Sequence, residues 1–117
     1  MRDYSLSDTE ENVKGSERML FVAVLKHSPE NCFGRVENAE AAEELREQWK
    51  KRDEIRKEAG VKVIGAYINP NEHTFYYILE TDDYKGVSKL LGPPMLTHHT
   101  AKITPVTRMK EAVAMLR

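Results

Sequence analysis

Apolar positions along the chain gather in four short runs that are rich in β-branched and aromatic residues. Each run has the length and composition of a β-strand, and turn residues separate it from its neighbours. Only Pro70, Asn71 and Glu72 separate the second run from the third, so these two strands form a predicted hairpin. The four predicted strands span residues 19–27, 61–69, 73–80 and 97–106.

The segments between the strands place apolar residues at helical spacing. Asn38 has the chemistry of an N-cap for a long helix, and Gly60 stands just past its end. Trp49 falls on the apolar face of that helix, which predicts that it packs in the core. The run Gly92-Pro93-Pro94 predicts the end of the second helix. The helices are predicted over residues 38–59, 84–91 and 107–117.

The order of these elements is β-α-β-β-α-β followed by a terminal helix. This order predicts an α+β, ferredoxin-like fold with a four-stranded antiparallel sheet. Residues 1–18 are polar and lack periodicity, so they cannot bury enough apolar surface to offset the entropy of ordering. The sequence therefore predicts a flexible tail over 1–18 and a single domain over 19–117.

The predicted sheet is apolar on both of its faces. In the first strand, Leu20, Val22 and Val24 alternate with Phe21, Ala23 and Leu25. Two helices can cover only one face of a four-stranded sheet, and the other face would leave a large apolar patch in water. A second copy of the chain would cover that patch, which predicts a homodimer. The alternative is that the terminal helix folds over the same face.

The composition limits the classes of partner and location. The chain has 117 residues, of which 40% are hydrophobic and 32% charged, with a net charge of −1. This balance predicts a soluble protein that binds neither nucleic acid nor membranes. A single cysteine cannot form an intramolecular disulfide, which favours a cytoplasmic location.

Five side chains that bind metals or move protons fall at ends of the predicted strands. In a ferredoxin-like sheet the first strand lies between the third and fourth. The end of the first strand, the hairpin turn and the start of the fourth strand then share one edge of the sheet. We therefore expect His27, Cys32, His73, His98 and His99 to lie close together.

A metal site is the first interpretation of this cluster. Imidazole and thiolate suit transition metals such as zinc, copper, nickel or iron. Glu30 and Glu72 could add oxygen ligands. The candidate ligands are His27, Cys32, His73 and His98.

Metal-free chemistry is the second interpretation. His27 or His73 would then serve as the catalytic base, beside a small-molecule pocket. The third interpretation is that the histidines are exposed polar residues and Cys32 is a small apolar one. Whether the protein is an enzyme stays open at this point. The candidate ligand-binding residues are Tyr67, Phe75, Tyr76 and Tyr77.

Two stretches of the sequence carry a resemblance to a known group of proteins. They are HSPENC at residues 27–32 and EHT at residues 72–74, which leads into the aromatic third strand. Together with the strand MLFVAV, they make residues 19–108 resemble small uncharacterised proteins of the dimeric α/β-barrel superfamily. The resemblance implies two sheets packed face to face and a small pocket in each subunit. It implies no single activity, because oxygenases, isomerases, dismutases and ligand-sensing domains share that architecture.

Together these patterns predict a small ligand-binding or enzymatic module with a pocket at the His/Cys cluster. The alternative is a non-catalytic homodimer that binds a metal, senses a ligand or binds a partner protein. Loss of turnover in a His27→Ala protein that still folds would distinguish the first from the second.

Overall fold

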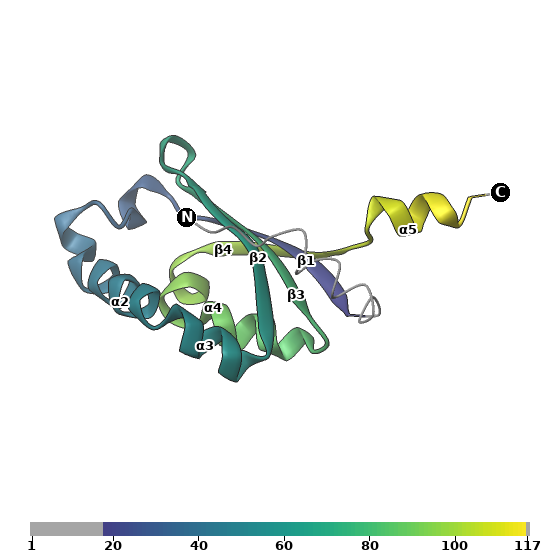
Figure 1. Cartoon of the computed structure of the whole chain (residues 1–117). Coiled ribbons are helices and arrows are strands. Elements are labelled where there is room, and N and C mark those ends of the chain that lie inside the picture. Colours follow the sequence, from purple (N-terminus) through teal and green to yellow (C-terminus); the bar gives the residue numbers. More distant parts are fainter. Residues whose placement is uncertain (1–17, 117) are drawn as a thin grey trace.

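Four strands form one antiparallel sheet in the order β2-β3-β1-β4 (Figure 1). A computed structural model of the chain describes residues 18–116. Strand β1 pairs with β3 and β4, and β2 pairs with β3, in every case antiparallel. The sheet and the order of elements confirm the predicted ferredoxin-like α+β fold. The strands are β1 (Met19–Lys26), β2 (Val61–Asn69), β3 (Thr74–Thr81) and β4 (Thr100–Val106).

The predicted tail lies outside the described residues, apart from its last residue. Arg18 is placed beside β1, with its guanidinium 3.4 Å from the Asp82 carboxylate and 4.0 Å from that of Glu80. Glu80 is buried and also pairs with Arg108 at 3.4 Å. The described part of the chain therefore begins one residue before the predicted start of the domain.

The helices differ from their predicted boundaries in two places. The predicted helix over 38–59 is two helices, because Lys51 leaves helical geometry with φ −101° and ψ 17°. The second predicted helix ends at Leu91 as expected, because the backbone is non-helical at Gly92 and Pro93, but a further helical segment that was not predicted follows this kink. Helix resumes at Pro94, which is tolerated because the first turn of a helix needs no backbone N–H. The helices are α2 (Ala39–Lys50), α3 (Arg52–Ala59), α4 (Tyr84–His98) and α5 (Met109–Ala114).

The core lies between the sheet and helix α4. Alternate residues of β1 point toward the helices, and α2, α3 and α4 all lie on that side of the sheet (Figure 1). The other face carries Val22, Val24 and Ile78, which are only partly buried. The fully buried apolar residues include Phe21, Ala23, Leu25, Leu79, Val87, Leu91 and Met95.

The prediction that Trp49 packs in the core is wrong, because 57% of its surface is exposed. The break at Lys51 lets α3 pack on β2 and α4, whereas α2 packs on α4 and stands away from the sheet. The indole therefore rests on the surface, where the Arg52 guanidinium stacks 4.3 Å from its ring centre. The prediction from helical periodicity treated residues 38–59 as one straight helix, whereas the helix breaks at Lys51.

Helix α5 does not cover the open face of the sheet. It continues past the end of β4 and projects away from the domain (Figure 1). Met109 and Leu116 are each 76% exposed. The alternative in which the terminal helix covers the sheet is therefore wrong, and the homodimer stays a prediction.

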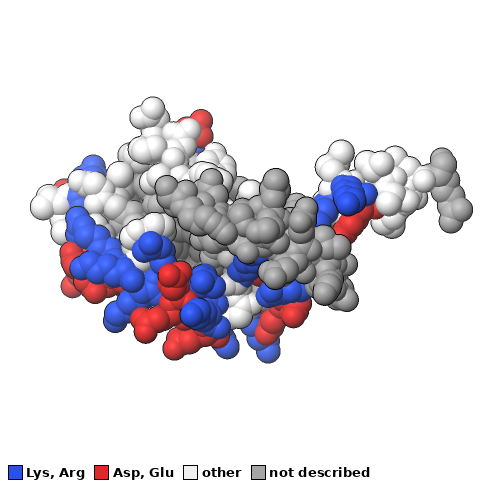
Figure 2. All heavy atoms as spheres, in the orientation of Figure 1, with Lys and Arg blue, Asp and Glu red and all other residues white. Residues whose placement is uncertain are grey.

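The surface over α2 and α3 carries lysine, arginine, aspartate and glutamate side chains interspersed with one another (Figure 2). Several of them form ion pairs three residues apart, such as Arg56 with Asp53 at 3.2 Å. Within residues 18–116, no helix has the length and apolar content needed to cross a bilayer.

Gly86, in the first turn of α4, lies where that helix comes closest to α3 and β2. A Cβ added there would lie 2.5 Å from the carbonyl oxygen of Ala59 and 3.0 Å from Val61. Because the nearest atom belongs to the backbone, relief requires the two helices to separate. We expect Gly86→Ala to lower the free energy of unfolding by about 2 kcal/mol, measured by urea denaturation.

Gly65→Ala is the matched control. A Cβ at Gly65 would meet the ring of Tyr67 at 2.7 Å, but that side chain is 63% exposed and can rotate away. We expect a cost below about 1 kcal/mol. Equal losses in the two variants would contradict the close approach assigned to Gly86.

Candidate metal centre

The four histidines and the cysteine come together at one end of the sheet. His27 directly follows β1, and Cys32 and His73 follow the short 3-10 turns η1 (Pro29–Asn31) and η3 (Pro70–Glu72). His98 ends α4 and His99 precedes β4. The ring centre of His27 lies 5.2 Å from that of His73 and 4.8 Å from that of His99.

His98 and His99 do not begin a strand, because β4 starts only at Thr100. Neighbours on a strand would point to opposite faces, whereas the helix end lets both imidazoles lie in the cluster. The ring of His98 stacks on Phe33 at 4.8 Å and 19°. Its Nε2 forms a hydrogen bond with the carbonyl oxygen of Asn31. His98 therefore braces the loop after β1.

A chain of hydrogen bonds fixes which nitrogen of His27 carries the proton. The Met95 carbonyl can only accept, so Nδ1–H of His99 donates to it at 2.8 Å. Nε2 of the neutral His99 is then an acceptor, and Nδ1–H of His27 donates to it at 2.9 Å. This leaves a lone pair on Nε2 of His27. That nitrogen is buried and has no hydrogen-bond partner among residues 18–116.

Burial keeps His27 and His99, the two histidines that these hydrogen bonds join, neutral. It lowers the pKa of His27 to about 4, with the neighbouring imidazoles of His99, His73 and His98 adding to the effect. Burial also lowers the pKa of His99, against the opposing effect of its bond to Met95. Near pH 7 the Nε2 lone pair of His27 is therefore not blocked by a proton.

Three side chains are close enough together to hold one ion. One donor atom each from His27, Cys32 and His73 lies within 4.8 Å of the others. Nδ1 of His73 is buried and has no hydrogen-bond partner in the described part of the chain. The predicted ligand His98 lies outside this group, as do Glu30 and Glu72, which are exposed. The ligands predicted from the sequence therefore include all three side chains of this group, together with His98, which lies outside it.

The comparisons with known proteins identify the family. A family model for a domain of unknown function, DUF3303, matches residues 19–117. The chain belongs to the DUF3303 family. No curated protein and no solved structure matches it. The family description carries no activity, so the function has to be inferred from the side chains of this DUF3303 domain.

The loop that carries Cys32 is fixed at several points in this DUF3303 domain. The side-chain amide of Asn38 donates to the carbonyl oxygens of Glu30 and Cys32, at 2.8 and 2.9 Å. Asn38 therefore ties the loop to the start of α2, and its side chain makes no capping bond to the helix. The backbone N–H of Gly34 donates to Sγ of Cys32 at 3.4 Å. Sequence reasoning missed this role because an N-cap also favours asparagine.

His73 adopts an unusual backbone conformation. Its φ of 54° lies in the left-handed region, which costs a residue with a Cβ of order 1 kcal/mol. Asn69 stabilises the turn by accepting from the N–H of Glu72 at 3.3 Å. The carbonyl of His73 accepts from the N–H of His27 at 3.1 Å. The turn thus presents the His73 imidazole directly beside His27.

The predicted ligand-binding aromatics fall on both faces of the sheet. Phe75 and Tyr77 face the helices, and the ring centre of Phe75 lies 5.2 Å from that of His99. Burial raises the pKa of Tyr77 to about 12. Tyr76 faces the opposite side and donates to Glu72 at 3.4 Å, while Tyr67 is exposed on the edge strand. Three of the four, Tyr67, Phe75 and Tyr77, line one groove beside α2, whereas Tyr76 does not line it.

Proposed function

We propose that this DUF3303 domain binds one transition-metal ion, of the zinc type, through His27, Cys32 and His73. The proposal is carried by two buried imidazole nitrogens, Nε2 of His27 and Nδ1 of His73, that have no hydrogen-bond partner among residues 18–116 and belong to the histidines grouped with Cys32. A buried polar atom without a partner costs free energy unless something binds it. A metal ion would satisfy both nitrogens at once.

The low pKa of His27 favours metal binding over acid–base catalysis. A general base works best when its pKa lies near the working pH, and a pKa of about 4 makes His27 a weak base. A metal ligand has the opposite requirement, because a proton competes with the ion for the same lone pair. The environment of His27 removes that competition at neutral pH.

The proposed ligand set suits zinc chemistry. Two imidazoles and one thiolate fill three positions of a tetrahedral ion and leave the fourth for water or a small ligand. His99 supplies the partner that metal-bound histidines usually have, since it accepts the Nδ1–H of His27 and is itself held by Met95. These features support tight binding of one ion.

Calorimetric titration of Zn²⁺ into the full chain, reduced and stripped with a chelator, tests the proposal. We expect one ion per chain and a higher melting temperature with zinc, because the ion binds only the folded site. Co²⁺ should give a thiolate charge-transfer band that Cys32→Ser abolishes. Absence of both the binding heat and the cobalt band would overturn the proposal.

A further inference from the structure

An apolar groove separates helix α2 from strands β2 and β3. Its volume of about 450 Å³ falls within the range of small-molecule sites, roughly 300–1,000 Å³. The groove exists because α2 packs on α4 and leaves the sheet edge uncovered. Its apolar walls include Leu45, Trp49, Ala66, Ile68, Phe75 and Tyr77.

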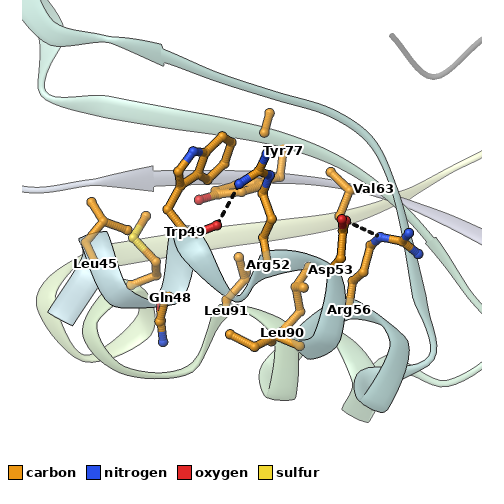
Figure 3. Close-up of a pocket in the computed structure, with 13 residues that line it drawn as sticks. Leu45, Gln48, Trp49, Arg52, Asp53, Arg56, Val63, Tyr77, Leu90 and Leu91 are labelled. Carbon is orange, nitrogen blue, oxygen red and sulfur yellow. Dashed lines mark hydrogen bonds and ion pairs between the residues drawn. The ribbon is translucent and has the colours of Figure 1, made fainter. Parts of the chain in front are cut away.

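Trp49 and Tyr77 line this groove and also line a second, smaller cavity between the helices and the sheet. Figure 3 shows that Trp49 and Arg52 rise from the helices toward Tyr77. The guanidinium of Arg52 stacks on the indole and donates to the carbonyl oxygen of Trp49 at 2.8 Å. These contacts hold the indole in place while more than half of it stays exposed.

The charged side chains that line the groove are cationic, and each of them pairs with a glutamate beside it. Among residues 18–116, the charged residues that line it are Arg46 and Lys50, both on α2. Arg46 pairs with Glu43 at 2.8 Å, and Lys50 pairs with Glu47 at 3.4 Å. All four side chains are at least half exposed, and such surface pairs contribute little in water. An anion in the groove can therefore compete for both cations.

We propose that the groove binds an organic anion with an extended apolar body and one acidic group, such as a medium-chain carboxylate. The body would lie against Trp49 and Ile68, and the acidic group would meet Arg46 and Lys50. Charge complementarity favours this class, since only an anion can take the place of Glu43 and Glu47 beside Arg46 and Lys50, and an uncharged chain gains nothing from the two cations.

This site is separate from the proposed metal centre. Phe75 contacts both, since it lines the groove and its ring centre lies 6.2 Å from that of His27. The arginine and lysine belong to α2, whereas the metal ligands belong to loops at the end of the sheet. Anion binding therefore does not require zinc, and a His27→Ala protein should retain it.

Trp49 is the only tryptophan of the chain, so its fluorescence reports on the groove. We would titrate the full chain with decanoate and with decan-1-ol, both below the concentrations at which they aggregate. Decanoate should change the emission saturably and bind about tenfold more tightly than decan-1-ol, because only decanoate can pair with the cations.

Three variants make the test specific. Arg46→Ala combined with Lys50→Ala should remove the tenfold preference for decanoate, whereas Lys57→Ala, an exposed lysine that does not line the groove, should keep it. Ala66→Phe should weaken both compounds by filling the groove. No saturable change with the wild-type chain would overturn the proposal, as would equal affinity for the two compounds. Loss of the preference in Lys57→Ala would also overturn it.

Discussion

Zinc affinity is expected to fall more than about 100-fold in His27→Ala, because the substitution removes the ligand whose lone pair is free and unprotonated. Partners of zinc ligands typically contribute 10–100-fold, so a direct ligand should exceed that range. His27 is 6% exposed, and its Nε2 has no competing hydrogen bond among residues 18–116. Calorimetric titration of the purified variant measures the change, with circular dichroism to confirm that the variant folds.

His98→Ala is the matched control for this prediction. His98 belongs to the same cluster, but its Nε2 is occupied by the Asn31 carbonyl and its ring stacks on Phe33. We expect its zinc affinity to stay within about threefold of the wild type. His99→Ala should weaken zinc by about 10–100-fold, since it removes only the acceptor that orients His27. If His98→Ala weakens zinc as much as His27→Ala, the assigned ligand set is wrong.

The metal-free domain should lose stability as the pH falls from about 6.5 toward 4. The folded state lowers the pKa of His27 from 6.5 to about 4, so over this window the unfolded chain binds more protons than the folded one. Proton binding then favours unfolding, and the stabilisation present above pH 6.5 is lost progressively below it. The loss should approach about 3 kcal/mol, since each tenfold change in proton affinity corresponds to about 1.4 kcal/mol.

His27→Phe tests the origin of this acid sensitivity. Phenylalanine suits a position whose neighbours include Phe33, at 5.9 Å between ring centres, and Phe75. Urea denaturation at a series of pH values, with chelator present, should give a flatter profile for the variant than for the wild type. Parallel profiles would show that other groups cause the acid sensitivity.

Much of the candidate site followed from sequence because topology constrains where strand ends meet. The alternation in β1 placed Phe21, Ala23 and Leu25 on one face, which the structure shows to be the buried one, and the run lengths identified four strands. Those strands, placed in the ferredoxin-like order, predicted that His27 lies between His73 on one side and His98 or His99 on the other. Each of these inferences depends on a local period or on connection length, which a single sequence carries.

The functional detail depended on contacts between residues far apart in the chain. Sequence could not show that Nε2 of His98 is occupied by Asn31, or that His99 orients His27 across 72 positions. It also placed Trp49 in the core, because periodicity does not report the break at Lys51. Hydrogen-bond direction and helix packing arise only when distant segments meet.

The sequence by itself determined the fold class, the strand order and the edge at which the candidate metal ligands gather. These features follow from the spacing of apolar residues and from the few connections that short loops allow. Only the tertiary structure decided which imidazole nitrogen has no hydrogen-bond partner among residues 18–116 and which histidine holds the loop after β1 in place. It also decided where an apolar groove stays open. Those outcomes depend on the burial of individual atoms and on hydrogen bonds between distant residues, which no local pattern encodes.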